Sequence, residues 1–339
     1  MKDFYKILQV ATEAEAEIIT SAYKTLARKY HPDTYKGPGA EDRMKEINGA
    51  YEVLNNHLKR TDYDRSRKGT GDSPPPSDKK DESDLNECPF CAELIKAKAI
   101  KCKHCGEMVN VNAKDGAEMI LIPAGEFLMG SQKGQGNDNE RPQHRVYLDA
   151  YYISNYEVTN EQFAQFMRGT GYDAGGDWKK YAKAGKEKHP VVCVNWDDAM
   201  AYCRWAGGTL PTEAQWEKAA RGNDDRQYPW GDSWEAGRCK NNSSGTTAVG
   251  SYPGGASPYG VQDMAGNIWE WCSDWFGDKY YGSSPSRNPE GPRSGVSRVV
   301  RGGSRGIACH NSFRCANRYG DLPDFRNSYC GFRFARTPR

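Results

Sequence analysis

The spacing of apolar residues predicts a short helical part at the start of the chain. Within residues 18–30 an apolar side chain recurs every four positions, and residues 44–54 carry a second stripe on one face. Such repeats are typical of amphipathic helices, and Thr12 is a good N-cap before the first of them. The two stripes consist of Ile18, Ala22, Leu26 and Tyr30, and of Met44, Ile47, Tyr51 and Leu54. We therefore expect an antiparallel pair of helices within residues 1–68, joined by an exposed loop.

The pattern changes beyond residue 115, where short apolar stretches alternate with turns. Thr159 can cap a helix, and Asp197 begins another. Thr212 with Gln215 forms a capping box before a third helix. Beyond Gly231, the residues Gly, Asn, Ser and Pro recur every few positions, so we expect loops to dominate. Much of this backbone must then be held by side chains or ions rather than by regular ladders.

Length and charge narrow the class of protein. The 339 residues are enough for two or three domains, and a net charge of +2 implies no general attraction to nucleic acid or membranes. No apolar run approaches the length of a membrane span, and Met1 leads directly into the polar helical part without a signal peptide. We therefore expect a cytoplasmic protein. In that compartment the 11 cysteines are metal ligands or buried thiols rather than a disulfide framework.

Two segments separate the helical part from the longer one. Residues 69–87 contain Pro74-Pro-Pro76 among Ser, Asp and Lys, which predicts a disordered, semi-extended linker that tethers the helical part. Residues 88–106 contain two C-x₂-C pairs separated by ten residues, and four thiolates in this arrangement suit a structural zinc ion. We predict a zinc ribbon in which the metal supplies the folding energy; iron or redox chemistry is the alternative, because rubredoxin-like knuckles share the spacing. The predicted zinc ligands are Cys88, Cys91, Cys102 and Cys105.

The loop between the two predicted helices contains the tripeptide His31-Pro-Asp33. Pro32 fixes the loop backbone and displays the polar side chains on either side of it. Together with the basic helix face that precedes it, this tripeptide resembles the J domain of DnaJ-type co-chaperones, which docks on a DnaK-type chaperone and stimulates its ATP hydrolysis. The resemblance implies a chaperone-binding site rather than a catalytic pair, and it implies these residues: His31, Pro32, Asp33, Lys24, Arg28 and Lys29. Gln9 stands where that family usually has Gly, and we expect this difference to matter little.

The stretch Tyr259–Trp275 places three tryptophans among acidic residues and just after a Gly-Asn pair. Aromatic side chains gain much by burial, whereas carboxylates avoid it unless they are paired or bound to a cation. This stretch resembles the core motif of the formylglycine-generating enzyme (sulfatase-modifying factor) family, and the resemblance covers residues 115–337. It implies a compact, irregular α+β fold related to C-type lectins. Further matching motifs are Ile122–Gly130, Tyr156–Asn160, His189–Val192, Leu210–Trp216, Tyr228–Gly231, Val300–Ser304 and Gly331–Arg333.

The same resemblance implies a structural calcium ion, a hard cation that prefers oxygen ligands. The implied ligands are the side chains of Asp263 and Glu270 and the carbonyl oxygens of Gly266 and Ile268. The family usually has Asn where Asp263 stands, and Asp donates oxygen equally well. The alternative interpretation is a buried tryptophan ladder with a hydrogen-bonded Glu270 and no cation.

The resemblance also raises the question of catalysis. The aerobic enzymes of the family hold copper(I) with two cysteines just after a Gly-Gly-Ser, since thiolates suit a soft ion. Here Ser304 is followed by Cys309 and Cys315, which have five residues between them, whereas the enzymes have four. We expect this slip to turn one sulfur away from the site. The chain is therefore more easily interpreted as a binding protein than as a copper- and oxygen-dependent oxidase of a substrate cysteine.

The last part of the chain has an unusual composition. Residues 291–339 contain no Lys, Glu, Gln, Met or Trp, the five residues that cannot arise when the first two bases of an Asn codon vary freely. The segment resembles the variable region of retroelement-diversified proteins; ordinary family bias is the alternative. The implied frame is Arg301–Ser304, Ala316–Arg318, Pro323-Asp324 and Gly331–Arg333. The implied varied positions are Gly306, Ile307, Ala308, His310, Asn311, Tyr319, Gly320, Asp321, Leu322, Phe325, Asn327, Ser328 and Tyr329.

A surface rich in Tyr, Ser, Gly and Asn is what adaptable binding sites use. We therefore predict that a protein or other ligand binds at this end of the chain. The residues we expect to contact it are Arg305, His310, Asn311, Tyr319, Asp321, Phe325, Asn327 and Tyr329. The predicted molecule is a multidomain α+β protein with an all-α J domain, a small zinc ribbon and a loop-rich α+β domain. Its predicted function is that of a co-chaperone or adaptor, with the oxidase as the alternative.

Overall fold

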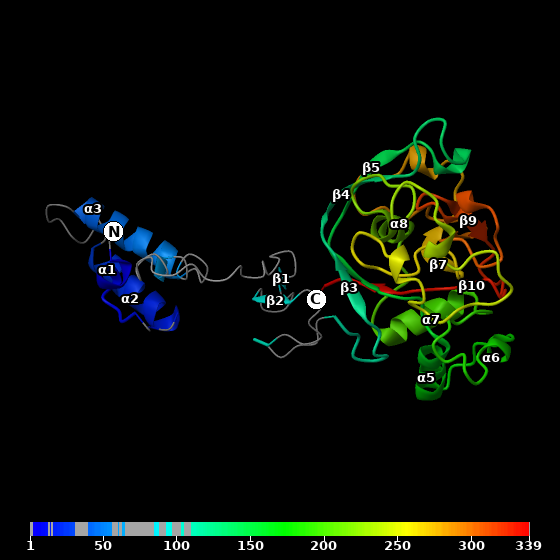
Figure 1. Cartoon of the computed structure of the whole chain (residues 1–339), viewed down its shortest axis with the longest axis horizontal. Helices are drawn as coiled ribbons and strands as arrows, with labels where there is room; N and C mark the ends of the chain where they lie inside the picture. Colours follow the sequence, from blue (N-terminus) through cyan, green and yellow to red (C-terminus); the bar gives the residue numbers. More distant parts are fainter. Residues whose placement is uncertain are drawn as a thin grey trace. The chain divides into compact units, whose positions relative to one another are not determined.

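The computed structural model of the chain describes residues 3–12, 14, 16–30, 40–55, 60, 63, 64, 85–87, 93–96, 103, 104 and 110–338. The chain divides into two compact units, residues 1–80 and residues 81–339 (Figure 1). Within the described residues, no helix combines the length and the apolar character that crossing a membrane would need.

The first unit is helical, as the apolar stripes predict. Its helices are α1 (Phe4–Leu8), α2 (Ala16–Lys29) and α3 (Ala40–Leu54). Their shared core contains Leu8, Leu26 and Leu54, and the rings of Tyr23 and Tyr51 stack with their centroids 3.9 Å apart. The core therefore forms between α2 and α3 with α1 packed against them.

The prediction of the apolar stripe on α2 is wrong at one position. Ile18 is 56% exposed, whereas its neighbour Ile19 is fully buried. An α-helix completes one turn every 3.6 residues, so positions with a strict four-residue spacing move gradually around the helix. Positions 19 and 26, which are seven residues apart, therefore share the buried face. Gln9, which ends α1, has a positive φ of 56°. Its backbone thus occupies the left-handed conformation that glycine adopts without steric cost.

The second unit begins with a hairpin of β1 (Leu85–Glu87) and β2 (Leu94–Lys96), paired antiparallel. Strand β1 therefore occupies the last three residues of the segment predicted as a linker, because Leu85–Glu87 pair with residues seven to eleven positions further along the chain. Cys88 and Cys91 fall between the two strands in the sequence. The four predicted zinc ligands lie outside the described residues.

The rest of the second unit contains three small sheets. A four-stranded sheet has the order β10-β7-β8-β9, in which only the β10–β7 pair is parallel; a three-stranded sheet has the order β11-β6-β3, and β4 pairs with β5. The strands are β3 (Met119–Ile122), β4 (Gly125–Met129), β5 (His144–Leu148), β6 (Tyr151–Ser154), β7 (Trp269–Trp275), β8 (Arg298–Arg301), β9 (Arg318–Asp321), β10 (Cys330–Gly331) and β11 (Ala335–Arg336).

Of the four helices described in the second unit, all but α6 begin at a capping box. They are α5 (Asn160–Thr170), α6 (Trp178–Tyr181), α7 (Trp196–Ala206) and α8 (Glu213–Arg221). The predicted caps Thr159 and Thr212 are confirmed, each in a capping box. Helix α7 starts before the predicted Asp197, because the side chain of Asn195 accepts a hydrogen bond from the Asp198 amide and Asp198 caps Asn195 in return.

Two large apolar cores fill much of the second unit, beside a smaller cluster around Tyr228 and Phe313. One surrounds Trp271 and the helices α5 and α7, and the other surrounds Trp216 of α8. Helix α8 lies among the strands near the centre of the unit (Figure 1), and eight of its residues are buried, including Glu213, Glu217 and Arg221. The predicted all-α domain and the loop-rich α+β domain are therefore both present. The short 3₁₀ helices are η2 (Asp138–Glu140), η3 (Ala236–Arg238), η4 (Pro253–Gly255), η5 (Tyr280–Gly282) and η6 (His310–Phe313).

Candidate functional site

The basic face predicted to bind a chaperone is present on α2. Lys24, Arg28 and Lys29 are exposed, and the Lys29 ammonium lies 5.3 Å from the centroid of the Tyr30 ring. These side chains lie away from the buried positions Ile19 and Leu26, as an amphipathic helix requires. His31, Pro32 and Asp33 lie outside the described residues, so their position relative to this face is a prediction.

The frame of the C-terminal segment is buried and held by ion pairs. Arg301 on β8 lies opposite Arg318 on β9, and both guanidinium groups reach the acids of α8. Arg318 makes two hydrogen bonds of 2.7 Å to Glu213, and Arg301 lies 2.6 Å from Glu217. The Arg318 and Arg301 guanidinium groups hold the pKa of the buried Glu213 carboxyl below its ordinary value against the opposing effect of burial. This network fixes β8 and β9, and β9 carries the varied positions Tyr319, Gly320 and Asp321.

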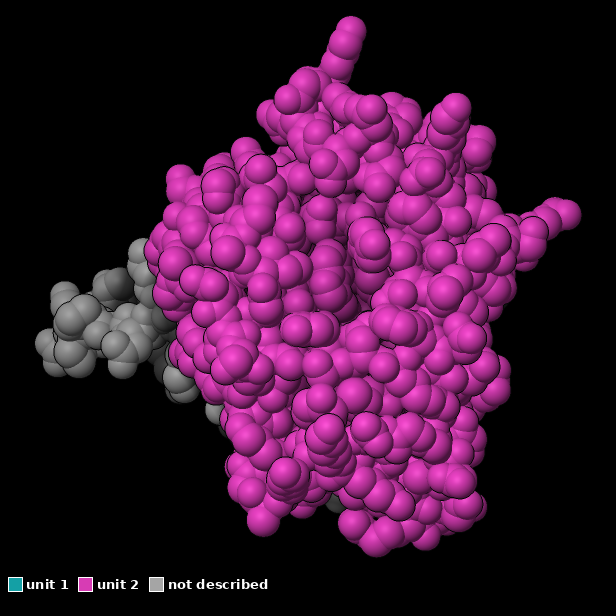
Figure 2. All heavy atoms as spheres, turned by 90° about the vertical axis from the view of Figure 1, so that its right-hand side faces the viewer, with its two compact units in different colours: residues 1–80 teal, residues 81–339 magenta. Residues whose placement is uncertain are grey.

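The varied positions lie at the surface, whereas most of the frame does not. None of the predicted varied positions is buried, and Tyr319 (60% exposed), Phe325 (50%) and Tyr329 (48%) are among the most exposed large apolar side chains of the described residues. Arg301–Ser304, Ala316–Arg318 and Gly331–Arg333 are buried, while Pro323 and Asp324 are not. We call the varied positions together the variable surface. Seen from the side of the second unit on which β9 and β10 lie, the molecule is hollowed near its centre (Figure 2).

Arg305 is a correction to the predicted ligand-contacting set, because it is only 4% exposed. Its guanidinium donates to the Ser328 carbonyl (2.6 Å) and lies 4.8 Å from the centroid of the Tyr329 ring. Arg305 therefore supports the variable surface from beneath. Asn327 and Asp321 are half-buried and bonded to each other, with 3.2 Å between Nδ2 and Oδ2. The other five residues of the predicted set are exposed: His310, Asn311, Tyr319, Phe325 and Tyr329.

The two cysteines that would hold copper in the alternative function have unlike environments. Cys309 is exposed and precedes η6, whereas Cys315 is 1% exposed within the core around α8. Burial raises the pKa of the Cys315 thiol to about 12, which disfavours the thiolate that a copper ligand needs. Ser304 is also buried. The described residues contain no group of three or more His, Cys, Asp or Glu side chains arranged to hold a metal ion. This arrangement does not fit a pair of copper-binding thiolates.

The residues expected to hold calcium are only partly suited to it. Both oxygens of the fully buried Glu270 accept hydrogen bonds from Arg333, at 2.6 and 2.7 Å, and Trp216 donates a further bond to Oε2. Glu270 is thus neutralised by an arginine. Asp263 accepts from the Gly250 amide at 2.6 Å and lies beside Glu157, whose Oε2 is buried without a hydrogen-bond partner.

Burial and the neighbouring carboxyls raise the pKa of Glu157 well above its ordinary value, and burial also raises that of Asp263. Two such carboxyls fit a cation that replaces their protons. The arrangement therefore suits Asp263 as a calcium ligand. Glu157, which sequence reasoning missed, is better suited to bind the ion than Glu270, because one of its oxygens has no hydrogen-bond partner. The missed signal was the acid inside the motif Tyr156–Asn160.

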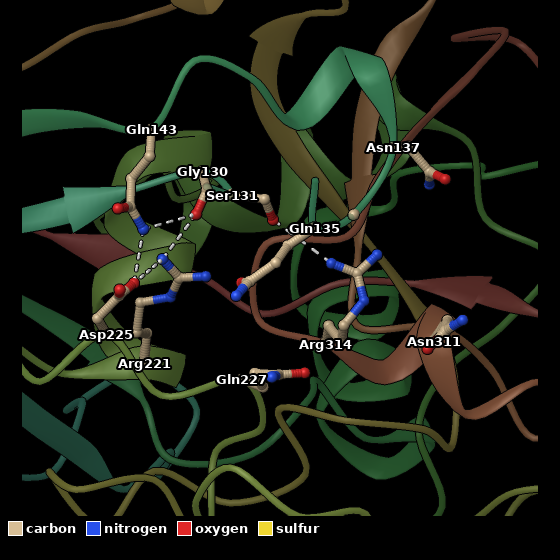
Figure 3. Close-up of a pocket in the computed structure, with 11 residues that line it drawn as sticks. Gly130, Ser131, Gln135, Asn137, Gln143, Arg221, Asp225, Gln227, Asn311 and Arg314 are labelled. Atoms are coloured by element: carbon tan, nitrogen blue, oxygen red, sulfur yellow. Dashed lines mark hydrogen bonds and ion pairs between the residues drawn. The ribbon is translucent and has the colours of Figure 1, made fainter. Parts of the chain in front are cut away.

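Sequence reasoning also missed a polar pocket of about 260 Å³. It lies where the connection between β4 and β5 meets the end of α8 and the η6 segment (Figure 3). Arg221 and Arg314 line it together with the amide side chains of Gln135, Gln227 and Asn311. The signal available in the sequence was the polar insertion of residues 132–143, which is rich in Gln, Asn and Gly.

Comparison with known proteins agrees with this architecture. Residues 105–338 match the family model of the sulfatase-modifying factor enzyme 1-like domain, and residues 3–64 match the DnaJ domain. The chain is 38% identical to the formylglycine-generating enzyme of Streptomyces coelicolor, over 64% of this chain and 88% of that protein. Two solved structures are similar to the second unit. PvdO from Pseudomonas aeruginosa is 27% identical with a TM-score of 0.60, covering 67% of this chain and 97% of that one. Treponema denticola variable protein 1 is 29% identical with a TM-score of 0.55, covering 66% and 95%.

Proposed function

Because the chain belongs to the sulfatase-modifying factor enzyme 1-like family and also carries a DnaJ domain, we propose that it is a co-chaperone adaptor. The DnaJ domain implies a co-chaperone role with a DnaK-type ATPase. In the proposed function, His31, Pro32 and Asp33 act with the exposed basic face of α2 to recruit that ATPase. The C-terminal domain binds a protein ligand through the variable surface and brings it to the chaperone.

One observation carries this proposal: the split between a buried frame and an exposed set of varied positions. An enzyme site needs a few fixed polar groups in a pocket, whereas an adaptable binding surface needs exposed side chains on a rigid support. Tyr319, Phe325 and Tyr329 supply such side chains, and the ion pairs of Arg301 and Arg318 supply the support. The similarity to a protein named as a variable protein supports the same interpretation.

The experiment is recovery of bound proteins from cells by the tagged full chain. The double variant Phe325→Ala/Tyr329→Ala removes two exposed rings without touching the buried frame. We expect it to lose at least about 90% of a bound partner, because exposed aromatic anchors dominate interface energies. Val296→Ala is the matched control, since Val296 is 77% exposed and lies outside the variable surface. Equal recovery by the wild type and the double variant would exclude this surface as the binding site.

Two metals belong to the proposal. We infer one structural zinc at Cys88, Cys91, Cys102 and Cys105, and the pairing of β1 with β2 on either side of the first cysteine pair supports it. We also infer one calcium held by Asp263 with the carbonyls of Gly266 and Ile268, and with Glu157 in place of Glu270. Metal analysis of the purified chain tests both: Cys88→Ser should lose the zinc alone, and Asp263→Ala the calcium alone.

A second candidate function is oxidation of a substrate cysteine to formylglycine. The observation in its favour is the 38% identity to an enzyme of that name, over 88% of that enzyme. It requires copper(I) bound by Cys309 and Cys315, with Ser304 nearby. Reconstitution with copper(I) under reducing conditions tests this candidate. One tightly held copper, lost in both Cys309→Ser and Cys315→Ser, would favour the oxidase, and oxidation of a cysteine-containing peptide would establish it. We expect no retained copper, because the Cys315 thiol is buried with a raised pKa.

A further inference from the structure

The polar pocket of the second unit has walls that are fixed before any ligand arrives. Glu140, itself fully buried, makes two hydrogen bonds to the Arg314 guanidinium at 2.7 and 2.8 Å. Gly136 has a positive φ of 64°, and a Cβ there would lie 2.2 Å from Glu140 Oε2 and 2.9 Å from Arg314 Nη1. The loop backbone thus closes directly onto this ion pair, and only glycine permits that approach.

The opposite wall is fixed by Arg221, which is 4% exposed. Its Nη1 donates to the carbonyl oxygens of Leu128 (2.9 Å) and Gly130 (2.8 Å) and contacts Asp225 at 3.2 Å. Its Nε is buried without a hydrogen-bond partner. Figure 3 shows the remaining terminal nitrogen of Arg221 pointing into the pocket, toward the amide of Gln135. A preorganised donor of this kind favours a ligand with acceptor oxygens.

The charges of both arginines are already balanced. Arg314 pairs with Glu140, and Arg221 lies 3.2 Å from Asp225 and 3.4 Å from Glu217. The Asp225 carboxylate also accepts from Gln143 at 2.6 Å. A bound anion would meet these carboxylates as well as the guanidinium groups, so the pocket gains little from a full negative charge. Its electrostatics favour a neutral ligand.

The groups open to a ligand are mainly primary amides. Gln135, Gln227 and Asn311 are exposed, and Figure 3 shows Gln135 reaching between the two arginines. Each amide offers two donors and an acceptor, the combination that matches a hydroxyl group, which both donates and accepts. The volume of about 260 Å³ lies below the range of roughly 300–1,000 Å³ that drug-sized ligands occupy, so the ligand is small.

We propose that this pocket binds one neutral, hydroxyl-rich unit the size of a single sugar residue. Asn311 belongs to the variable surface and also lines the pocket. The inference therefore rests on the proposed ligand-binding role of this unit, and it names a class of ligand for the pocket beside the variable surface. Arg221 and Arg314 orient the unit, and the side chain at position 311 adjusts which hydroxyl pattern fits.

The test uses ligand-observed NMR on the full chain with glucose, galactose, mannose and N-acetylglucosamine, each at millimolar concentration, and with sodium acetate as the anionic probe. We expect at least one saccharide to bind. The double variant Gln135→Ala/Gln227→Ala, which changes exposed side chains only, should raise its Kd at least tenfold. Gln165→Ala is the matched control, because it removes an exposed glutamine of the same unit outside the pocket.

Three results would overturn the inference: no saccharide bound by the wild type, binding that the double variant leaves unchanged, or acetate bound more tightly than every saccharide. Gly136→Ala is a second test variant, because the added methyl group would displace the loop from Glu140. We expect it to weaken saccharide binding as well. The two variants distinguish failure of the saccharide proposal from failure of the proposed adaptor function. Phe325→Ala/Tyr329→Ala should lose the protein partner while keeping the saccharide, and Gln135→Ala/Gln227→Ala alters the saccharide affinity.

Discussion

At the scale of single residues, the second unit places an unusual number of charged side chains in its interior. Arg301, Arg318 and Arg333 are among its largest fully buried side chains, and each is paired with an acid. A buried ion pair adds little net stability compared with an apolar pair, but losing one partner leaves an uncompensated charge in the interior. We therefore expect the frame held by these arginines to be intolerant of change.

Glu213→Gln tests this role of the buried pairs. The substitution keeps the shape of the side chain but leaves Arg318 without its carboxylate and weakens the pairing of Arg301. We expect the free energy of unfolding of the second unit to fall by about 3–5 kcal/mol, measured by chemical denaturation. Glu126→Gln is the control: the Glu126–Arg145 pair is exposed, so its loss should cost at most about 1 kcal/mol. Similar losses in both variants would contradict a special role for the buried network.

The carboxyls of Glu157, Asp263 and Asp274 give the second unit a pH dependence. Burial raises the pKa of each, and that of Asp274 reaches about 7. The folded chain then holds protons that the unfolded chain has released, so stability is greatest at low pH within this window and falls as the pH rises from about 4 towards 7. In calcium-free buffer we expect the Tm of the second unit to fall between pH 5 and pH 8.

Glu157→Gln removes one of these titrations and leaves an amide that can donate to Asp263. We expect this variant to show a shallower fall of Tm with pH and to gain about 1 kcal/mol of stability at pH 8, because a buried carboxylate oxygen without a hydrogen-bond partner is gone. Calcium should raise the Tm of the wild type at pH 8 and raise that of the variant less. A wild-type Tm that rises from pH 5 to pH 8 would show that these carboxyls are ionised in the folded chain.

At the scale of elements, helix α8 links the strands to the frame. It supplies Glu213 and Glu217 to Arg301 and Arg318, and it ends at Arg221 in the wall of the polar pocket. Its position depends on its first turn, where the Thr212 side chain accepts from the Gln215 amide and Gln215 bonds back to Thr212. The capping box therefore fixes the positions of the buried Glu213 and Glu217 side chains.

Thr212→Ala should destabilise the second unit by about 1 kcal/mol, since the first turn of α8 loses its cap. The measurement is the shift in the denaturation midpoint, with Thr337→Ala as the control at an exposed position near the end of the chain. An unchanged midpoint in Thr212→Ala would mean that packing alone fixes the start of α8.

How far the sequence predicts these elements depends on how local each signal is. Capping boxes are complete within four residues, so the starts of α5 and α8 were predictable. The exposure of the variable surface was predictable as well, since the resemblance to retroelement-diversified proteins separated its positions from those of the frame. The partner of Glu270 was not, because Arg333 lies 63 residues away. The pocket was missed for the same reason: its walls come from three distant segments.

At the scale of the whole molecule, the chain joins a DnaJ domain to a sulfatase-modifying factor enzyme 1-like domain. A J domain acts on the ATPase of its partner chaperone. In the proposed function, the rest of the chain brings the J domain to the client, the protein that the chaperone is to act on. In the proposed function, the domain with the buried frame and the exposed variable surface binds that client. The buried thiol of Cys315 and the exposed rings of the variable surface both favour binding over oxidation.

The central claim is that this chain is a co-chaperone, and the most direct test is the steady-state ATP hydrolysis of a purified DnaK-type chaperone. We expect the wild-type chain to stimulate hydrolysis several-fold and His31→Gln to abolish the stimulation, while His31→Gln still recovers the partner of the variable surface. His104→Gln is the control for loss of a histidine elsewhere and should stimulate like the wild type. Stimulation that survives in His31→Gln, or none with the wild type, would contradict the account.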